Sequence, residues 1–256
     1  MKPPILELRN VSKHFHIYNQ EKTLFRLGKA LLKGVPIRRE LWALKNINLE
    51  IHEGDKVAIV GRNGAGKTTL LRLIAEIYTP NEGEVKIRKT PQPLFKYGIG
   101  LNPFLSVLDN IYVLGAFHGL LVSEMNRVLE DIIEFSGLRE FLYAPAKDLS
   151  SGQKQRLLFS VFIHAASDFL LSDESTAMAD LEFQIKSGQW FEKLMTSPKT
   201  LLLCSHNLTF LEKHCTKALW LEKGEIKAWG EPKEVLEAYK SFCQSLETDR
   251  LRPSGW

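Results

Sequence analysis

The feature that most constrains how this 256-residue chain can fold is a glycine-rich segment, residues 61–68, with the sequence GRNGAGKT. It matches the pattern G-x-x-x-x-G-K-[ST], follows an apolar stretch at residues 56–60 and precedes a helix-forming stretch at residues 69–77. Glycines in such a loop let successive backbone N–H groups point the same way and cradle phosphate oxygens, while the N-terminus of the next helix adds partial positive charge. The segment therefore predicts a strand, a phosphate-binding loop and a helix in succession, as in a nucleoside triphosphatase or a kinase.

Composition narrows the class of protein only slightly. Apolar residues make up 44% and charged residues 25% of the chain, which is typical of a globular protein with one well-filled core. No apolar run reaches the ~18 residues that cross a bilayer, and the first ten residues lack the apolar core of a secretory signal. Three cysteines without metal-ligand spacing predict buried thiols in a reducing compartment, and a net charge of +4 does not argue for nucleic acid.

Strand and helix patterns alternate along the chain. The predicted strands include residues 5–12, 42–60 with a turn at 53–55, and 84–88. The predicted helices include residues 107–142, a helix opened by residues 149–153 with its apolar stretch at 154–165, and residues 232–246. This order predicts an α/β fold with a mostly parallel sheet, helices on both of its faces and an inserted α-helical subdomain at about residues 107–158.

Four further segments stand in a fixed order after the phosphate loop. They are LSSGQ at residues 149–153, FLLSDE at 169–174, STAMAD at 175–180, and His206 after the apolar residues 200–204. In order and spacing they resemble the signature, the Walker B strand, the D-loop and the switch histidine of ATP-binding-cassette proteins. The chain is thus identified as a member of that superfamily. The resemblance implies a P-loop NTPase (RecA-like) fold with an N-terminal antiparallel β region beside the parallel sheet.

The resemblance also implies a homodimer in which ATP lies between the phosphate loop of one copy and the signature of the other. The residues expected to bind ATP are Gly61, Asn63, Gly64, Ala65, Gly66, Lys67, Thr68, Thr69, Phe15, Ser151, Gly152, Gln153 and Asp180. Lys67 would reach the β- and γ-phosphates, and Thr68 and Asp173 would hold Mg²⁺. Glu174 is the expected general base and His206 the expected donor to the γ-phosphate.

Two positions in this set leave alternatives open. Residues 11–15, VSKHF, resemble the family segment whose aromatic ring stacks on adenine, which indicates Phe15. Tyr18 and Trp42 are the alternatives for this stacking. For all three residues, the other interpretation is packing in the core. Most members also carry a metal-contacting glutamine where this chain has residues 96–103 without one. Gln92 lies too early to replace it, so water or Asn102 would take its place.

The D-loop departs from the family pattern as well. It ends in Met-Ala-Asp rather than in the commoner Ala-Leu-Asp, so the expectation that Asp180 contacts the other copy is weaker.

Two features resemble one branch of the superfamily. Residues 98–115, without the glutamine, look like the same segment in cassette ATPases that export lipid-linked polysaccharides, namely O-antigens, capsules and wall teichoic acids. An insertion at about residues 16–41 strengthens this resemblance. Within it, residues 24–33 have the spacing of a short basic amphipathic helix, followed by Arg38 and Arg39. We expect this element at the membrane surface, beside the opening of the transporter; the alternative is a helix packed on its own domain with solvated charges.

The resemblance therefore implies an ATPase subunit that powers export of a lipid-linked polysaccharide. Two copies would bind two copies of a polytopic membrane permease at the cytoplasmic side of the inner (cytoplasmic) membrane, with no nucleic acid partner. Residues 1–256 are expected to form a single nucleotide-binding domain without a C-terminal glycan-binding module. The alternatives are an exporter ATPase for a lipid or peptide, or a soluble cassette protein acting on ribosomes or DNA.

Overall fold

The structure, a computed structural model, divides into two compact units. The described residues are 3–18, 38–94, 100–165, 167–173 and 181–251. The first unit comprises residues 1–52, 59–88 and 218–256, and the second comprises residues 53–58 and 89–217. Strands β3 (Lys56–Val60) and β8 (Lys217–Glu222) are each shared between the two units.

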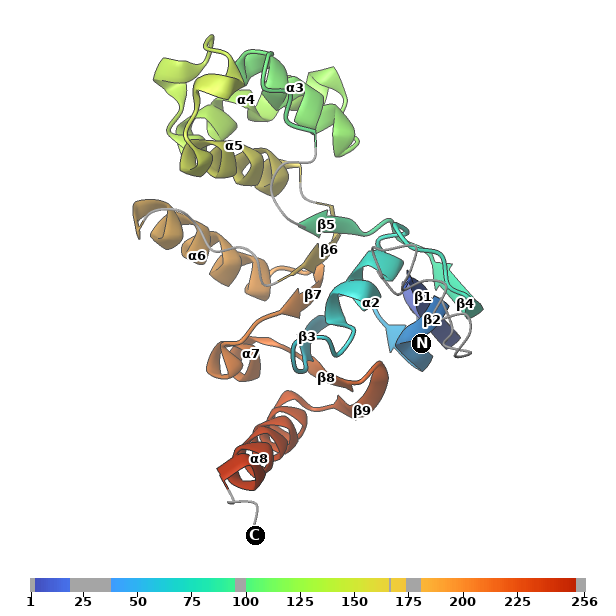
Figure 1. Cartoon of the computed structure of the whole chain (residues 1–256). Coiled ribbons are helices and arrows are strands. Elements are labelled where there is room, and N and C mark those ends of the chain that lie inside the picture. Colours follow the sequence, from blue (N-terminus) through green and yellow to red (C-terminus); the bar gives the residue numbers. More distant parts are fainter. Residues whose placement is uncertain (1–2, 19–37, 95–99, 166, 174–180, 252–256) are drawn as a thin grey trace, which may run out of the picture. The chain divides into compact units, whose positions relative to one another are not determined.

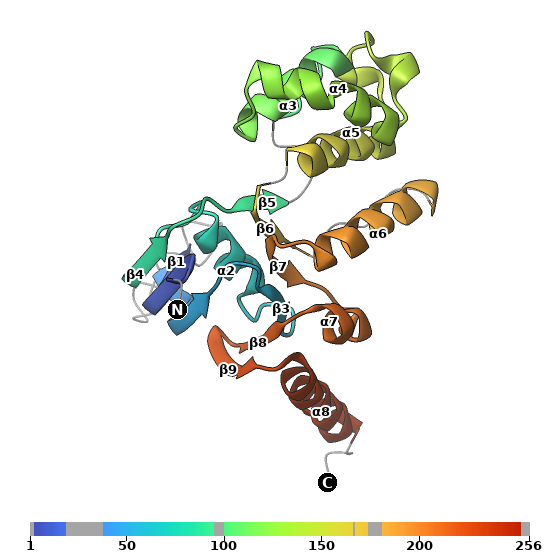
Figure 2. The ribbon, with the colours of Figure 1, turned by 180° about the vertical axis from the view of Figure 1, so that it is seen from behind.

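The first unit contains an antiparallel sheet of three strands in the order β2-β1-β4, which lie side by side in both views (Figures 1 and 2). Its strands are β1 (Leu6–Tyr18), β2 (Arg38–Ile51) and β4 (Glu82–Ile87). Apolar side chains alternate along β1 and β2, and Leu6, Leu8 and Ile51 are buried. The predicted N-terminal antiparallel region is thus confirmed. Strand β1 runs six residues beyond its predicted end because β2 pairs with it as far as Tyr18 and Arg38.

The phosphate-loop segment of this unit leads from β3 into helix α2 (Lys67–Ile74). Four apolar residues of α2 are buried. The helix ends earlier than predicted because Glu76 has a φ of 57°, which lies outside the helical range. Ile77, which was expected in the helix, is 52% exposed. A hairpin of β8 and β9 (Glu225–Gly230) and the C-terminal helix α8 (Pro232–Leu251) complete the unit.

The second unit contains a parallel sheet with β5 (Gln92–Leu94), β6 (Phe169–Ser172) and β7 (Thr200–Cys204). Every residue of β6 and β7 is buried, as expected for parallel strands covered on both faces. The N–H of Leu201 donates to the carbonyl of Asp55 over 2.9 Å, which ties β7 to the segment that begins β3.

The helices α3 (Val107–Phe117), α4 (Val122–Ser136) and α5 (Ser151–His164) gather in this unit around one apolar core (Figure 1). They confirm the helical periodicity predicted from residue 107. The helices are interrupted near residues 118–121 and 137–150, and the second interruption contains the short 3-10 helices η1 (Arg139–Phe141) and η2 (Ala146–Asp148). Two more helices, α6 (Leu181–Thr196) and α7 (Leu208–His214), follow β6 and β7. Within the part of the chain that the structure describes, no helix is both long enough and apolar enough to span a membrane.

The described residues include only the two ends of the predicted insertion at residues 16–41. The amphipathic helix expected at residues 24–33 lies outside them.

Candidate functional site

Two glycines of the phosphate loop are required by close backbone packing within the first unit. A Cβ at Gly61 would overlap the carbonyl oxygen of Leu221 on β8, and a Cβ at Gly66 would lie 2.5 Å from the carbonyl oxygen of Ala43. Both positions also have positive φ, which disfavours any residue with a side chain. Gly64 differs, because no described atom lies within 4 Å of a Cβ built there. The loop thus has a packed side and an open side.

The lysine of the loop lies over the loop itself. Lys67 Nζ donates to the carbonyl oxygens of Gly61 at 2.6 Å and of Arg62 at 3.3 Å. Helix α2 begins at this lysine, and its N-cap residue, Gly66, has no side chain with which to accept the first N–H groups of the helix. The N-terminus of α2 and the Lys67 ammonium therefore bring positive charge to one place, as an anion site requires.

The remaining loop residues divide between anchors and exposed groups. Arg62 forms an ion pair with the buried Glu222, with 3.8 Å between Nη1 and Oε1, and Ala65 is buried. The exposed members of the predicted set are Asn63, Gly64 and Thr68, and Thr69 is half-buried. The exposed residues Asn63, Gly64 and Thr68 are therefore the ones that a nucleotide could contact.

The two described aromatic candidates for adenine stacking lie on opposite faces of the β1–β2 ribbon. Phe15 pairs with Leu41, whereas Trp42 pairs with His14, and successive residues of a strand face opposite ways. The ring of Phe15 is edge-on to that of Tyr78, with centroids 5.3 Å apart. Because Tyr78 comes shortly after α2, this contact places Phe15, rather than Trp42, on the face of the ribbon that meets the phosphate-loop helix. The third candidate, Tyr18, ends β1, and its side chain lies outside the described part.

Sequence reasoning missed Tyr78. Its hydroxyl accepts a hydrogen bond from Arg72 Nη1 at 3.0 Å, and Lys13 Nζ lies 5.4 Å from the ring centroid of Phe15 and 5.9 Å from that of Tyr78. The available signal was an aromatic residue just after the loop helix. These contacts hold Phe15 beside Tyr78 and Lys13, and Phe15 is half-buried.

In the second unit, a predicted metal ligand, Asp173, and a predicted catalytic residue, His206, follow neighbouring strands. Asp173 comes directly after β6 and His206 two residues after β7, and these strands are parallel neighbours. Both residues therefore leave the sheet at the edge formed by the carboxyl ends of its strands, where α/β proteins bind ligands. His206 is exposed and Asp173 half-buried. Glu174 and Asp180 lie outside the described residues, so their roles stay predictions.

The signature segment begins helix α5 in the same unit. Ser150 Oγ accepts from the N–H of Gln153 at 3.2 Å, and Gln153 Oε1 accepts from the N–H of Ser150 at 2.8 Å. This reciprocal capping box fixes the first turn of α5, so the signature segment opens the helix as predicted. Ser151 is exposed and Gly152 half-buried, while the side-chain oxygen of Gln153 already has a backbone partner.

The side-chain oxygens of Gln92 and Asn102, the residues nearest to the position of the missing glutamine, each accept a backbone hydrogen bond. Gln92 is buried, its Oε1 accepts from the N–H of Ser167 at 2.5 Å, and its Nε2 lies 3.1 Å from His118 Nδ1. Burial lowers the pKa of His118, so the neutral ring suits the acceptor role in that contact. Asn102 Oδ1 accepts from the N–H of Phe104 at 3.0 Å and shapes a turn.

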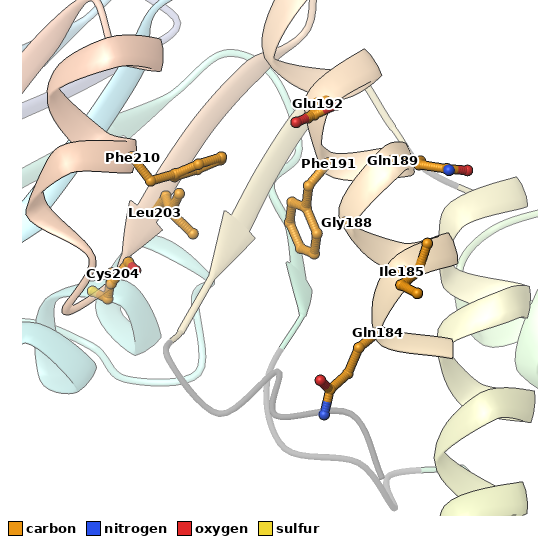
Figure 3. Close-up of a pocket in the computed structure, with 10 residues that line it drawn as sticks. Gln184, Ile185, Gly188, Gln189, Phe191, Glu192, Leu203, Cys204 and Phe210 are labelled. Carbon is orange, nitrogen blue, oxygen red and sulfur yellow. The ribbon is translucent and has the colours of Figure 1, made fainter. Parts of the chain in front are cut away.

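A cavity of about 430 Å³ opens elsewhere in the second unit, with Phe191 from α6 and Phe210 from α7 on opposite sides (Figure 3). Its other lining residues include Ile185, Gly188 and Leu203. The lining includes the acidic Glu192 but no basic side chain and none of the predicted site residues, so this cavity is not a candidate phosphate site.

Residues 44–177 match the family described as ABC transporter. A teichoic acids export ATP-binding protein TagH from Staphylococcus epidermidis is 34% identical over 242 residues, which cover 94% of this chain and 90% of the relative. The protein of the same name from Bacillus anthracis is 35% identical over 93% of this chain and 43% of its own length. An O-antigen export system ATP-binding protein RfbB from Myxococcus xanthus is 38% identical over 80% of this chain and 47% of its own length. The chain thus spans less than half the length of some curated relatives and nine-tenths of another.

Solved structures share the fold. A dimeric ATP-binding cassette in a post-hydrolysis state, bound to ADP and Pi, has a TM-score of 0.67 at 24% identity and covers 89% of this chain and 98% of its own. An ATP binding subunit of an ABC transporter has a TM-score of 0.69 at 19% identity, covering 92% of this chain and 93% of its own. These likenesses confirm the predicted α/β fold of a P-loop NTPase.

Proposed function

This chain belongs to the ABC transporter family, and we propose that it is the ATPase subunit that powers export of a lipid-linked polysaccharide across the cytoplasmic membrane. One observation carries the proposal: 34% identity to a teichoic acids export ATP-binding protein over 94% of this chain and 90% of that protein. The 38% identity to an O-antigen export ATP-binding protein supports a polysaccharide as substrate without selecting the sugar.

The phosphate loop would bind the triphosphate of ATP. Lys67 would exchange the carbonyl oxygens of Gly61 and Arg62 for phosphate oxygens, and the N-terminus of α2 would add its partial charge. The open side at Gly64 leaves room for phosphate oxygens to approach the backbone. Phe15, held beside Tyr78, would stack on adenine.

Hydrolysis would depend on positioning and on neutralisation of charge. The Thr68 hydroxyl and the Asp173 carboxylate are hard oxygen donors of the kind that Mg²⁺ prefers, and a bound Mg²⁺ would offset the charge on the β- and γ-phosphates. Glu174 would orient the attacking water and accept its proton, and His206 would donate to the γ-phosphate. Ser151, Gly152, Gln153 and Asp180 would come from a second copy of the chain and complete each site in a head-to-tail homodimer.

The helical part of the second unit carries exposed aromatic residues that suit a membrane-embedded partner. Phe104 is 80% and Tyr143 81% exposed. They lie on adjacent segments, because Ser106 and Pro145 form a β-bridge and the N–H of Val107 donates to the carbonyl of Ala144 at 3.0 Å. Large exposed apolar side chains in one place are typical of interaction surfaces. Two copies of the chain would use this surface to bind two polytopic permease subunits from the cytoplasmic side.

The test is a Glu174→Gln variant, assayed as purified protein and as the sole copy in cells. We expect ATP binding to be retained, turnover to fall at least ~100-fold, a closed dimer to persist with ATP, and lipid-linked polysaccharide to accumulate inside the cells. Near-normal turnover would remove Glu174 from its role. Lost turnover with unchanged surface polysaccharide would refute the polysaccharide as substrate while leaving the ATPase in place.

A further inference from the structure

One face of the β1–β2 ribbon carries a set of metal-ligand side chains that the nucleotide site does not use. His14, His16 and Glu40 each offer one ligand atom, and these atoms all lie within 4.8 Å of one another. His14 and His16 are two residues apart on β1 and so share a face, and Glu40 is the cross-strand partner of His16 on β2. Three ligands are thus presented by two paired strands rather than by a loop.

The surroundings of these ligands favour an ion over a simple hydrogen-bonded cluster. His14 Nδ1 is buried and has no hydrogen-bond partner among the described residues, and most buried polar atoms in proteins have one. The rings of His14 and His16 are nearly perpendicular, with centroids 4.9 Å apart. Trp42, the cross-strand partner of His14, lies 4.9 Å from its ring and covers that end of the set with an apolar surface.

We propose that His14, His16 and Glu40 bind one divalent transition-metal ion of the zinc class, with water as a further ligand. Two imidazoles and a carboxylate form a common three-residue ligand set for Zn²⁺, whereas Mg²⁺ prefers oxygen ligands in an octahedron. Bonds of about 2.0–2.2 Å place the ligands of a tetrahedral ion ~3.4 Å apart. The ligand atoms of His14, His16 and Glu40 lie up to 4.8 Å apart, so small side-chain rotations would bring them to the separations that a bound ion needs.

The ion would cross-link β1 to β2 near the end of the ribbon. The last paired residues are Tyr18 and Arg38, so the site lies two to four residues from the point where both strands lead into residues 19–37. Phe15 stands between the two histidines and points to the opposite face. The proposed site is therefore separate from the nucleotide site and fixes the backbone on either side of Phe15.

The experiment uses the full chain without an affinity tag, stripped with EDTA and kept in excess Mg²⁺ so that oxygen-ligand sites are filled. Zn²⁺ binding is measured by calorimetry, and Co²⁺ serves as the spectroscopic probe. We expect one Zn²⁺ per chain and the strong visible absorption of four-coordinate Co²⁺. The double variant His14→Ala/His16→Ala should lose both signals, and Glu40→Gln should weaken Zn²⁺ binding at least tenfold. His214→Ala, which removes a histidine on α7 stacked against Phe210, should bind like the unmodified chain.

The outcomes separate clearly. Zn²⁺ affinity in the double variant equal to that of the unmodified chain would overturn the proposal, as would a Co²⁺ spectrum of the free hydrated ion. Glu40 is exposed, so Glu40→Gln tests the site without disturbing the core. If the double variant unfolds, the imidazole NMR signals of the unmodified chain decide: those of His14 and His16 should shift on adding Zn²⁺, and shifts confined to other histidines would refute the site.

Discussion

Alanine substitutions at Gly61 and Gly64 should damage the protein in different ways, although both glycines belong to the same loop. At Gly64 the added carbon meets no described atom within 4 Å, so the cost is that of a left-handed backbone with φ +80°, about 1–2 kcal/mol. At Gly61, with φ +153°, the carbon would also overlap the carbonyl oxygen of Leu221, a backbone atom that cannot rotate away. Strain and overpacking together cost about 2–6 kcal/mol.

The assay combines urea unfolding with titration of a fluorescent ATP analogue. Gly64→Ala should lower the free energy of unfolding by only about 1–2 kcal/mol, because the added carbon strains the backbone without meeting a neighbouring atom. It should nevertheless weaken nucleotide binding at least about tenfold, since the added carbon occupies the open side where phosphate would lie. Gly61→Ala should lose more unfolding free energy than Gly64→Ala. Gly188→Ala in α6, where the added carbon also meets no described atom within 4 Å, serves as the control and should be neutral or slightly stabilising.

Two results would refute this reasoning. Equal unfolding free energies for Gly61→Ala and Gly64→Ala would mean that contact with β8 does not constrain the loop. Unchanged nucleotide affinity in Gly64→Ala would mean that the open side of the loop is not where phosphate binds.

Two further predictions follow from pKa values. Burial lowers the pKa of His118 below its usual 6.5, so the unfolded chain takes up a proton before the folded chain as the pH falls through 6.5. The free energy of unfolding should therefore fall between pH 7 and the lower folded pKa, by at most about 1.4 kcal/mol per pH unit. In urea unfolding at a series of pH values, His118→Gln should flatten this slope. An identical slope in the variant would contradict the lowered pKa of His118. Burial also raises the pKa of Cys215 to about 12. Alkylation of this thiol by iodoacetamide at pH 8 should therefore be at least about a hundredfold slower in the folded chain than in the denatured chain. Mass spectrometry measures both rates. Comparable rates in the two states would show that the thiol is not buried.

Local patterns were enough to predict much of the fold. The phosphate loop, the parallel strands β6 and β7 and the helices from residue 107 each depend on residues close together in sequence. The length of β1 could not be predicted in this way, because its second half is held by pairing with β2, across residues far away in the chain. The early end of α2 likewise depends on a positive φ at Glu76, a residue type that gives no such signal.

The site was predictable in its chemistry but less so in its geometry. Which face of the ribbon Phe15 occupies depends on the register of β1 against β2, and this register shifts at three places between Leu8 and His14. The capping box of α5 was visible in the sequence as Ser150 followed three residues later by Gln153. The resemblance predicted Gln153 as a ligand of ATP, whereas its side-chain oxygen accepts the N–H of Ser150 in this capping box.

The hydrogen bonds of Lys67 to its own loop bear on how the protein distinguishes ATP from ADP. Lys67 Nζ donates to the carbonyl oxygens of Gly61 and Arg62, so a phosphate oxygen that binds the ammonium would have to displace these internal partners. The cost of that exchange would be the same for ATP and for ADP. These hydrogen bonds would therefore weaken both affinities by one common factor. Discrimination between the two nucleotides is then left to groups that contact the γ-phosphate.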